Sequence, residues 1–174
     1  MERRLHIGGG YRHEGWEVLD AIPAAHVDHV CNAADLSGFP EGTFSEIYAS
    51  HVLEHFDYRD ELLETLREWR RVLQPGGRLY VSVPDMDILA ALFLDKESHS
   101  VEEQFFVMRM IFGGHVDAYD HHKVGLNESF LASFLIHAGF KNICRVGSFG
   151  LFDDSSEGQF KGTPISLNVI AEKD

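Results

Sequence analysis

The sequence is poor in cysteine and in basic residues. Its two cysteines, Cys31 and Cys144, lie far apart, so they form no disulfide framework, and we expect both to be small buried hydrophobes. Fifteen Lys and Arg residues stand against 28 Asp and Glu, which gives a formal net charge of −13. Nucleic-acid phosphates and anionic membranes attract clustered cations, so this balance argues against either as the main partner.

Long apolar segments are also missing. The longest uninterrupted apolar run, residues 88–94, is far shorter than the ~20 residues that span a bilayer. The start, MERRLHIGGG, leads into a glycine cluster rather than the apolar region of a secretory signal, so we expect a cytoplasmic protein. No repeat or low-complexity tract stands out, and 174 residues suit one domain over 1–174.

Apolar runs alternate with helix-like stretches, a pattern that favours an α/β fold with a largely parallel sheet. Helices are expected over residues 59–73, 85–113 and 127–137, and a final hairpin over 140–146 and 165–171. The other expected strands each stop at a polar or glycine-rich loop: residues 4–7, 16–19, 26–31, 44–49 and 78–83. In a parallel sheet these loops share the carboxyl edge, where ligands bind.

A glycine cluster and a following acid have the order of a nucleotide-ribose site. Gly8 to Gly10 follow the first strand, and Asp20 ends the second, 12 residues after Gly8. A dinucleotide site places that acid about 20 residues on, after a helix whose amino terminus meets the pyrophosphate. Residues 11–15 are too few for such a helix. The spacing therefore favours an adenosine ligand without phosphate, S-adenosylmethionine, over NAD, although a plain glycine turn is the simpler alternative.

Four segments carry a resemblance to a known family: LHIGGG, GWEVLDA, AADLSGFPEGTFSEIYASHVLEHF and RVLQPGGRLYVSVPD. The chain resembles class I S-adenosylmethionine-dependent methyltransferases, and more narrowly a short bacterial group found among polysaccharide-biosynthesis genes. The resemblance implies a Rossmann-like fold with a mostly parallel central sheet and an antiparallel strand near the carboxyl end. The short spacing after Gly10 departs from the family and predicts a reduced or absent first helix. It also implies methyl transfer from S-adenosylmethionine to a hydroxyl of a sugar or another small metabolite.

The resemblance further implies a set of cofactor-binding residues in the loops after the first four strands: Gly8, Gly10, Asp20, Asn32, Asp35, Ser50 and His51. Asp20 would bind the ribose diol, and either Asn32 or Asp35 the adenine amino group. His6 stands where the family carries an acid, and the first helix is missing. A non-catalytic module that binds S-adenosylmethionine or S-adenosylhomocysteine is therefore an alternative.

The 11 histidines include a rival motif. Residues 51–55, HVLEH, match H-x-x-E-H, in which two histidines on one helix bind zinc and the glutamate acts as base. A zinc-dependent hydrolase is therefore a second alternative. The preceding residues 44–49 look like a strand, however, which places His51 at a strand-to-helix junction rather than inside a helix. We expect no metal here.

A second histidine cluster, residues 115–123, follows Gly113 and Gly114 and reads as a loop near the sheet's carboxyl edge. Histidine suits the removal of a hydroxyl proton because its ordinary pKa lies near neutrality. Our hypothesis makes His122 the general base and Asp120 the residue that orients it, with Tyr119 and Lys123 contacting the acceptor. Hydrogen bonding to the backbone and metal binding are the alternatives for this loop.

Residues 105–112 are rich in phenylalanine and methionine at helical spacing, which indicates mostly core packing. Some of these side chains are also suited to an acceptor pocket or a dimer face. Without a first helix part of the cofactor cleft would lie open, and a second copy of the chain in a homodimer would cover it.

Overall fold

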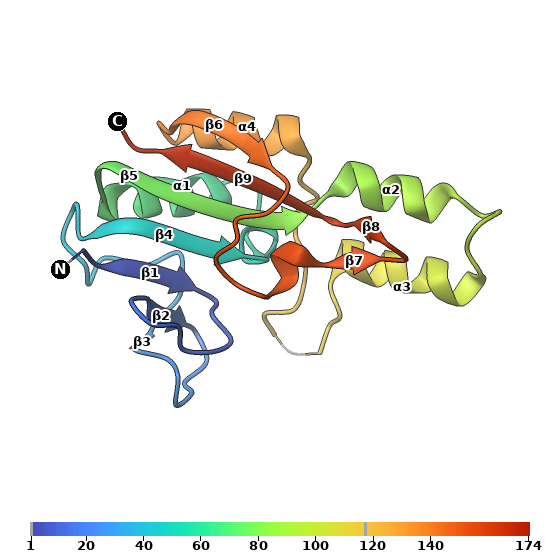
Figure 1. Ribbon diagram of the computed structural model, residues 1–174, viewed down its shortest axis with the longest axis horizontal. Helices are drawn as coiled ribbons and strands as arrows, with labels where there is room; N and C mark the ends of the chain where they lie inside the picture. The colour runs from blue at the N-terminus through green and yellow to red at the C-terminus, as the bar shows by residue number, and fades with distance from the viewer. Residues whose placement is uncertain (1, 117) are drawn as a thin grey trace.

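The computed structural model describes residues 2–116 and 118–174. Seven strands form one sheet in the order β3-β2-β1-β4-β5-β9-β6 (Figure 1). Their bounds are β1 Arg4–Ile7, β2 Glu17–Asp20, β3 His29–Val30, β4 Phe44–Ser50, β5 Leu73–Pro84, β6 Lys141–Val146 and β9 Ser166–Glu172. Only β9 runs against its neighbours β5 and β6 in this sheet. The predicted Rossmann-like sheet with one antiparallel strand near the carboxyl end is confirmed.

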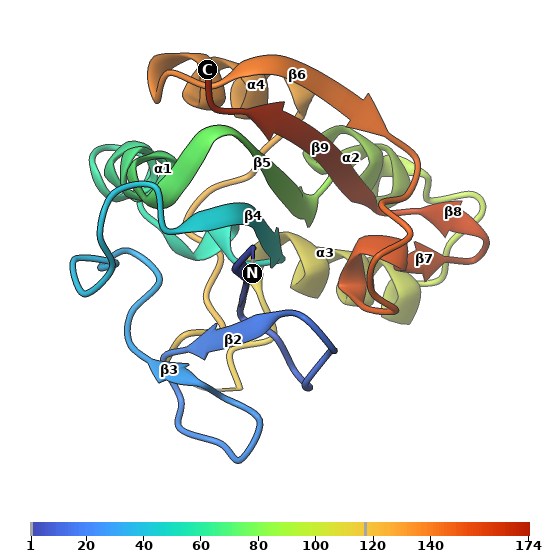
Figure 2. The same ribbon diagram turned by 60° about the vertical axis from the view of Figure 1, so that its left-hand side comes forward.

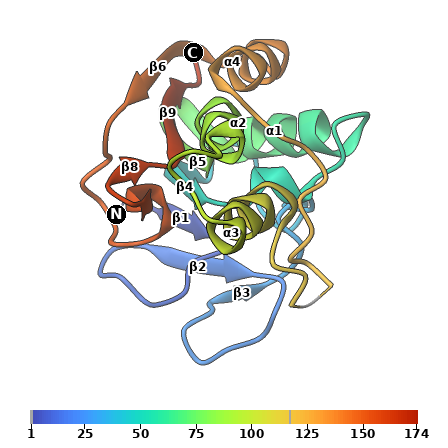
Figure 3. The same cartoon turned by 90° about the vertical axis from the view of Figure 1, so that its right-hand side faces the viewer.

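Two helices cover one face of the sheet, and two others lie beyond the end of β5. α1 (Glu61–Val72) and α4 (Glu128–His137) pack behind the sheet (Figures 1 and 2), and Asn127 caps α4 as expected. α2 (Met86–Leu94) and α3 (Val101–Phe112) lie side by side (Figure 3). The stretch over 85–113 that was expected to be helical forms two helices, because Ser100 and Glu103 form a capping box that starts the second one.

The predicted absence of a first helix is confirmed, since the described residues between β1 and β2 form turns only. Aromatic side chains cover the sheet face opposite α1 and α4 instead. Trp16, Tyr48, Tyr80 and Phe152 form a buried cluster there. Phe152 comes from the segment between β6 and β7 (Gln159–Phe160), which crosses in front of the sheet in Figure 1. Loops therefore replace a helical layer on this face.

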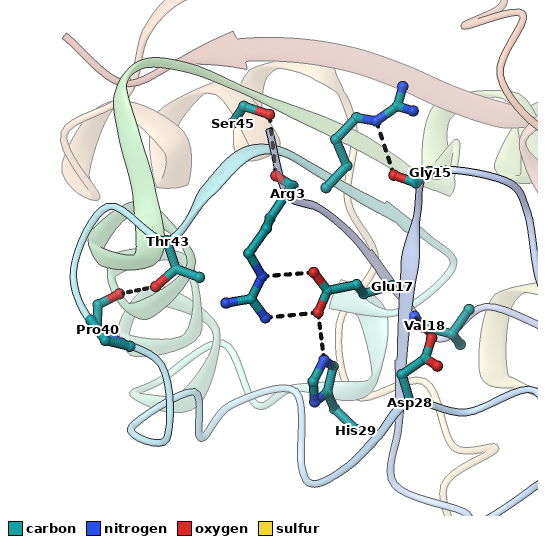
Figure 4. A network of polar contacts seen from close by, with 10 residues as sticks. Arg3, Gly15, Glu17, Val18, Asp28, His29, Pro40, Thr43 and Ser45 are labelled. Atoms are coloured by element: carbon teal, nitrogen blue, oxygen red, sulfur yellow. Dashed lines mark hydrogen bonds and ion pairs between the residues drawn. The ribbon is translucent and has the colours of Figure 1, made fainter. Parts of the chain in front are cut away.

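An ion-pair network joins the short edge strands (Figure 4). Glu17 in β2 accepts two hydrogen bonds of 2.7 Å from the Arg3 guanidinium, and its Oε2 lies 2.7 Å from Nε2 of His29 in β3. The hydrogen bonds from Arg3, with a smaller contribution from His29, lower the pKa of Glu17 to about 2. Of the strand expected over 26–31, only His29–Val30 form a strand, β3, and the ion-pair network joins this strand to β2.

The carboxyl-terminal strands β6 and β9 pair as expected. Their connection also holds a short helical turn (Ser155–Glu157) and a small hairpin of β7 with β8 (Thr163–Pro164). The expectation of buried cysteines is wrong, because Cys31 is half-buried and Cys144 exposed.

The apolar stretch of α3 is buried only in part. Val107 is fully buried against Leu89 and Phe160, whereas Phe105, Phe106 and Phe112 are exposed by about half or more. The core interpretation therefore fails for these three phenylalanines. Among the described residues no helix is long and apolar enough to cross a membrane.

Candidate functional site

Two adjoining cavities lie at the carboxyl edge of the parallel strands. The larger, called here the main cleft, has a volume of about 480 Å³, and the smaller, the side hollow, about 240 Å³. The loops after β1, β2, β3 and β4 form the main cleft together with part of residues 118–123. Side chains of α2 and α3 and the end of β5 form the side hollow. His51 and Asp120 line both, so the two cavities share a wall.

The structure brings four of the predicted cofactor residues together in the main cleft: Gly8, Asp20, Asn32 and His51. Gly8 has a φ of +73°, and an added Cβ would stand 2.8 Å from Cγ2 of Val52, so only glycine fits. The carboxylate of Asp20 accepts a hydrogen bond of 2.7 Å from the backbone N–H of Ile22. This bond holds the side chain of Asp20 in place at the start of the loop after β2.

The other three predicted cofactor residues, Gly10, Asp35 and Ser50, do not line the main cleft. Nothing lies within 4 Å of a Cβ added at Gly10, which stands in open space on the loop toward Trp16. Asp35 accepts from the backbone N–H of Ser37, so its carboxylate closes its own turn. The hydroxyl of Ser50 lies 3.3 Å from Oδ1 of Asp154, to which it donates. Of the two adenine candidates, only Asn32 faces the cleft.

His51 connects the two cavities through an uncommon backbone conformation. Its φ of 55° lies in the left-handed region, which redirects the side chain after β4. The hydroxyl of Ser166 donates to the carbonyl of Ser155, so Nε2 of His51 donates to Ser166 Oγ at 2.9 Å. This leaves Nδ1 of His51 without a proton. Burial lowers the pKa of His51 to about 4, so the ring is neutral near pH 7.

His122, the proposed base, lines the side hollow. Its Nδ1 donates to the carbonyl of Ile111 at 3.2 Å, and its Nε2 lies 3.9 Å from Oε1 of Glu54. Burial is the main reason that the pKa of His122 is lowered, so the ring is neutral and able to take a proton. Sequence reasoning missed Glu54 as a neighbour of His122, because they lie far apart in the chain.

Asp120 was predicted to orient His122. Its Oδ2 accepts from the backbone N–H of Val116 at 3.2 Å, and its own carbonyl accepts from the N–H of His115. These bonds hold the loop that carries His122, and the charge of Asp120 acts to raise the pKa of His122. Asp117, in the same predicted cluster, lies outside the described residues.

Tyr119 and Lys123, the predicted acceptor contacts, line the main cleft rather than the side hollow. Nζ of Lys123 forms an ion pair of 2.9 Å with Glu61 of α1. The backbone N–H of Lys123 donates to the carbonyl of Glu54 at 2.8 Å, which joins this loop to the segment after β4. The loop that carries Lys123 therefore forms one wall of the main cleft and is anchored both to α1 and to the segment after β4.

The HVLEH segment lacks the helix that a zinc hydrolase needs. Only residues Leu53–His55 are helical, as a single 3₁₀ turn, and His51 stands before it in the left-handed conformation. His51 and His55 therefore do not project from one α-helical face as the hydrolase motif requires.

Gly9, the middle glycine of the cluster, leaves room for the buried side chain of His6. His6 is buried, and its ring lies 4.2 Å from that of Phe152 and 4.9 Å from that of Tyr48, measured between centroids. A Cβ at Gly9 would lie 2.9 Å from this ring. Desolvation lowers the pKa of His6 to about 4, so the position that holds an acid in the resembling family holds a neutral imidazole here.

Comparison with known proteins agrees with this geometry. Residues 17–81 match the model of a family described as a methyltransferase domain. This segment runs from β2 into β5 and holds Asp20, Asn32 and His51. A search of curated protein sequences finds no match.

Solved structures share the fold at low sequence identity. A SAM-dependent methyltransferase from Archaeoglobus fulgidus is 15% identical, with a TM-score of 0.61 over 99% of this chain and 86% of that one. A 1,6-didemethyltoxoflavin-N1-methyltransferase from Burkholderia thailandensis, solved with S-adenosylhomocysteine, is 17% identical, with a TM-score of 0.61 over 98% and 70%. A possible exported protein from Bordetella parapertussis is 12% identical, with a TM-score of 0.60, and the chain covers only 61% of its length.

The fold and the matched segment agree. Residues 17–81 are similar to a methyltransferase domain, and the solved structures share the fold of the whole chain.

Proposed function

We propose that the chain transfers a methyl group from S-adenosylmethionine to a hydroxyl of a sugar or another small metabolite. The observation that carries this proposal is the main cleft itself. Gly8, Asp20 and Asn32 reach it from three successive strand ends, and His51 separates it from a second cavity. The sugar acceptor rests on the resemblance to the short bacterial group.

The main cleft suits the cofactor in size and chemistry. Its volume of about 480 Å³ falls within the usual range for small-molecule sites. Gly8 leaves room for close approach to the backbone, and the carboxylate of Asp20 is suited to accept hydrogen bonds from both ribose hydroxyls. The side-chain oxygen of Asn32 already accepts from the N–H of Ala34. The amide nitrogen of Asn32 is a donor, so it is suited to a ring nitrogen of adenine rather than to the adenine amino group. When bound, the cofactor supplies an electrophilic methyl group.

The side hollow suits the acceptor. It adjoins the main cleft at His51 and mixes apolar walls, Leu89 and Met110, with the cation Arg109. Holding the acceptor oxygen in line with the methyl group provides much of the acceleration in such a transfer. The oxygen forms the new bond to the methyl carbon, the carbon–sulfur bond breaks, and the hydroxyl proton passes to a base. Neutral His122 is the proposed base, with Asp120 holding its loop. Tyr119 and Lys123 line the main cleft rather than the side hollow, so they contact an acceptor only where it extends into the main cleft.

A methyl-transfer assay tests this proposal. The purified protein is incubated with isotopically labelled S-adenosylmethionine and a panel of sugar and small-molecule hydroxyl acceptors, and S-adenosylhomocysteine and labelled product are measured. We expect turnover with at least one acceptor, and a loss of about 100-fold or more for His122→Gln, the usual contribution of a general base. His137→Gln on α4 is the matched control and keeps the wild-type rate.

Binding of the cofactor without transfer to any acceptor would instead support a non-catalytic module. Retention of the wild-type rate by His122→Gln would contradict the base assignment. A homodimer covering the main cleft is a separate proposal. A monomeric mass at micromolar concentration with cofactor present would contradict it.

A further inference from the structure

Glu54 is a buried acid that the proposed reaction does not use. Its side chain is 2% exposed, and neither carboxylate oxygen has a hydrogen-bond partner among the described residues. A buried carboxylate without partners is costly unless it is protonated, paired or bound to a metal. Three imidazoles surround it: those of His51, His55 and His122.

His55 and His122, which lie beside Glu54, are oriented to act as metal ligands. Nδ1 of His55 lies 3.2 Å from the carbonyl of His121, and Nδ1 of His122 lies 3.2 Å from that of Ile111. A carbonyl only accepts, so the neutral form of each ring carries its proton on Nδ1 and keeps a lone pair on Nε2. Metal-bound histidines are characteristically held in this way, by a hydrogen bond from the other nitrogen to a backbone carbonyl.

We propose that Glu54, His55 and His122 bind a divalent transition-metal ion. One ligand atom from each lies within 4.8 Å of the others. Bonds of about 2.1 Å place neighbouring ligand atoms roughly 3 to 3.5 Å apart, so the site has to contract by about 1 Å. Two imidazoles and one carboxylate favour ions such as Zn²⁺ or Co²⁺ over Mg²⁺, which prefers oxygen ligands.

The backbone holds the ligands in place. The N–H of Lys123 donates to the carbonyl of Glu54. This backbone hydrogen bond joins the segment that carries His122 to the segment that carries Glu54, directly next to both proposed ligands. His51 adds a fourth candidate ligand atom, since its unprotonated Nδ1 lies 3.5 Å from Oε1 of Glu54. This assignment departs from the sequence expectation of no metal. It also differs from the zinc-hydrolase motif, because His122 is a ligand and no helix is needed.

The ion would lie between the two cavities, since His55 lines the main cleft and His122 the side hollow. Its role in catalysis rests on the proposed function. There an open coordination position would take the acceptor oxygen and lower the pKa of its hydroxyl, so that the proton would pass to solvent water. His122 would then serve as ligand, and direct proton removal by His122 is the arrangement expected if no ion binds.

A cobalt titration tests the site without any methyl acceptor. Untagged protein is stripped with a chelator, dialysed, and titrated with Co²⁺ while the visible absorption is recorded. We expect one equivalent to bind with ligand-field bands that Zn²⁺ abolishes. Glu54→Gln, which keeps the shape of the side chain, and His122→Gln should each weaken binding by at least about 10-fold. His137→Gln should leave it unchanged.

Two results would overturn the proposal: no Co²⁺ binding by wild-type protein at sub-millimolar concentration, or equal affinity in wild type and Glu54→Gln. Thermal unfolding of each variant shows that it is folded, and Glu54→Gln is expected to fold because glutamine is neutral and has nearly the same shape as the buried glutamate. Titration of the same samples with S-adenosylhomocysteine separates the two proposals. Cofactor binding without Co²⁺ binding refutes the metal site alone, and the converse refutes the cofactor site alone.

Discussion

The neutral imidazole of His6 makes the stability of the fold depend on pH in a predictable way. His6 is 3% exposed between Tyr48 and Phe152, and burial lowers its pKa from 6.5 to about 4. In the unfolded chain the ring gains its proton as the pH falls through 6.5, whereas in the folded chain it stays neutral down to about 4. The unfolded state therefore binds more protons in this window, and the free energy of unfolding falls with pH.

The magnitude follows from the width of that window. Between pH 6.5 and 4.5 the folded ring stays mostly neutral, and each pH unit costs about 1.36 kcal/mol, or about 2.5 kcal/mol in all. We choose His6→Leu as the perturbation, because leucine is apolar and carries no titratable group. Nδ1 of His6 has no hydrogen-bond partner among the described residues, so leucine removes no bond at that atom.

Urea unfolding at pH 7.5 and 4.5, with a chelator present, measures the effect. Between pH 7.5 and 4.5 the free energy of unfolding of the wild-type protein should fall by about 2.5 kcal/mol more than that of His6→Leu. The other buried histidines titrate alike in the two proteins, so their contribution cancels in this comparison. A parallel loss of stability in the two proteins would refute the account of His6 as a buried neutral ring.

Three further predictions concern single contacts. Gly8 has a φ of +73° and lies against Val52, so the added methyl group of Gly8→Ala is strained. This variant should lower the free energy of unfolding by about 1–2 kcal/mol in urea and weaken cofactor binding. Arg145→Ala removes the ion-pair partner of buried Asp85, 2.8 Å away, and should lower the free energy of unfolding by about 1–2 kcal/mol in thermal unfolding. The effect is modest because solvent partly screens the exposed arginine. Glu17→Gln removes the carboxylate whose pKa Arg3 lowers to about 2, so it should lower the free energy of unfolding by about 1 kcal/mol at pH 7. This loss should shrink as the pH falls from about 4.5 and disappear below about 2, where the wild-type acid is itself neutral in the folded protein. Unchanged unfolding curves would contradict each.

The sheet and the main cleft were predictable because their signals are local. Each apolar run ends at a loop, and parallel strands bring those loops to one edge, so Gly8, Asp20 and Asn32 were expected to meet. The short spacing between Gly10 and Trp16 also showed that the first helix is missing. These inferences needed only the order of the residues along the chain.

Side-chain direction within the loops was not predictable. Ser50 and His51 are neighbours, yet Ser50 turns to Asp154 while the left-handed φ of His51 sends its ring between the cavities. Nothing in the sequence marks that conformation. Asp35 looked like a ligand because an Asx turn and a binding acid share one residue type.

The grouping of Glu54 with His122 was out of reach for a different reason. The two residues meet only because the loop after α3 returns to the segment after β4 through the backbone bond from Lys123 to Glu54. A long-range contact of this kind depends on how the whole chain packs, and no periodicity or spacing reports it.

Calorimetric titration with S-adenosylhomocysteine tests the central claim, a cofactor site in the main cleft, most directly. Wild-type protein, Asp20→Ala and the matched variant Asp35→Ala are compared, because the structure places the first acid in the cleft and the second outside it. We predict one-site binding that weakens by about 1–3 kcal/mol, or roughly 5- to 150-fold, in Asp20→Ala and stays at the wild-type value in Asp35→Ala. No binding at millimolar ligand, or equal affinity in wild type and Asp20→Ala, would contradict the account.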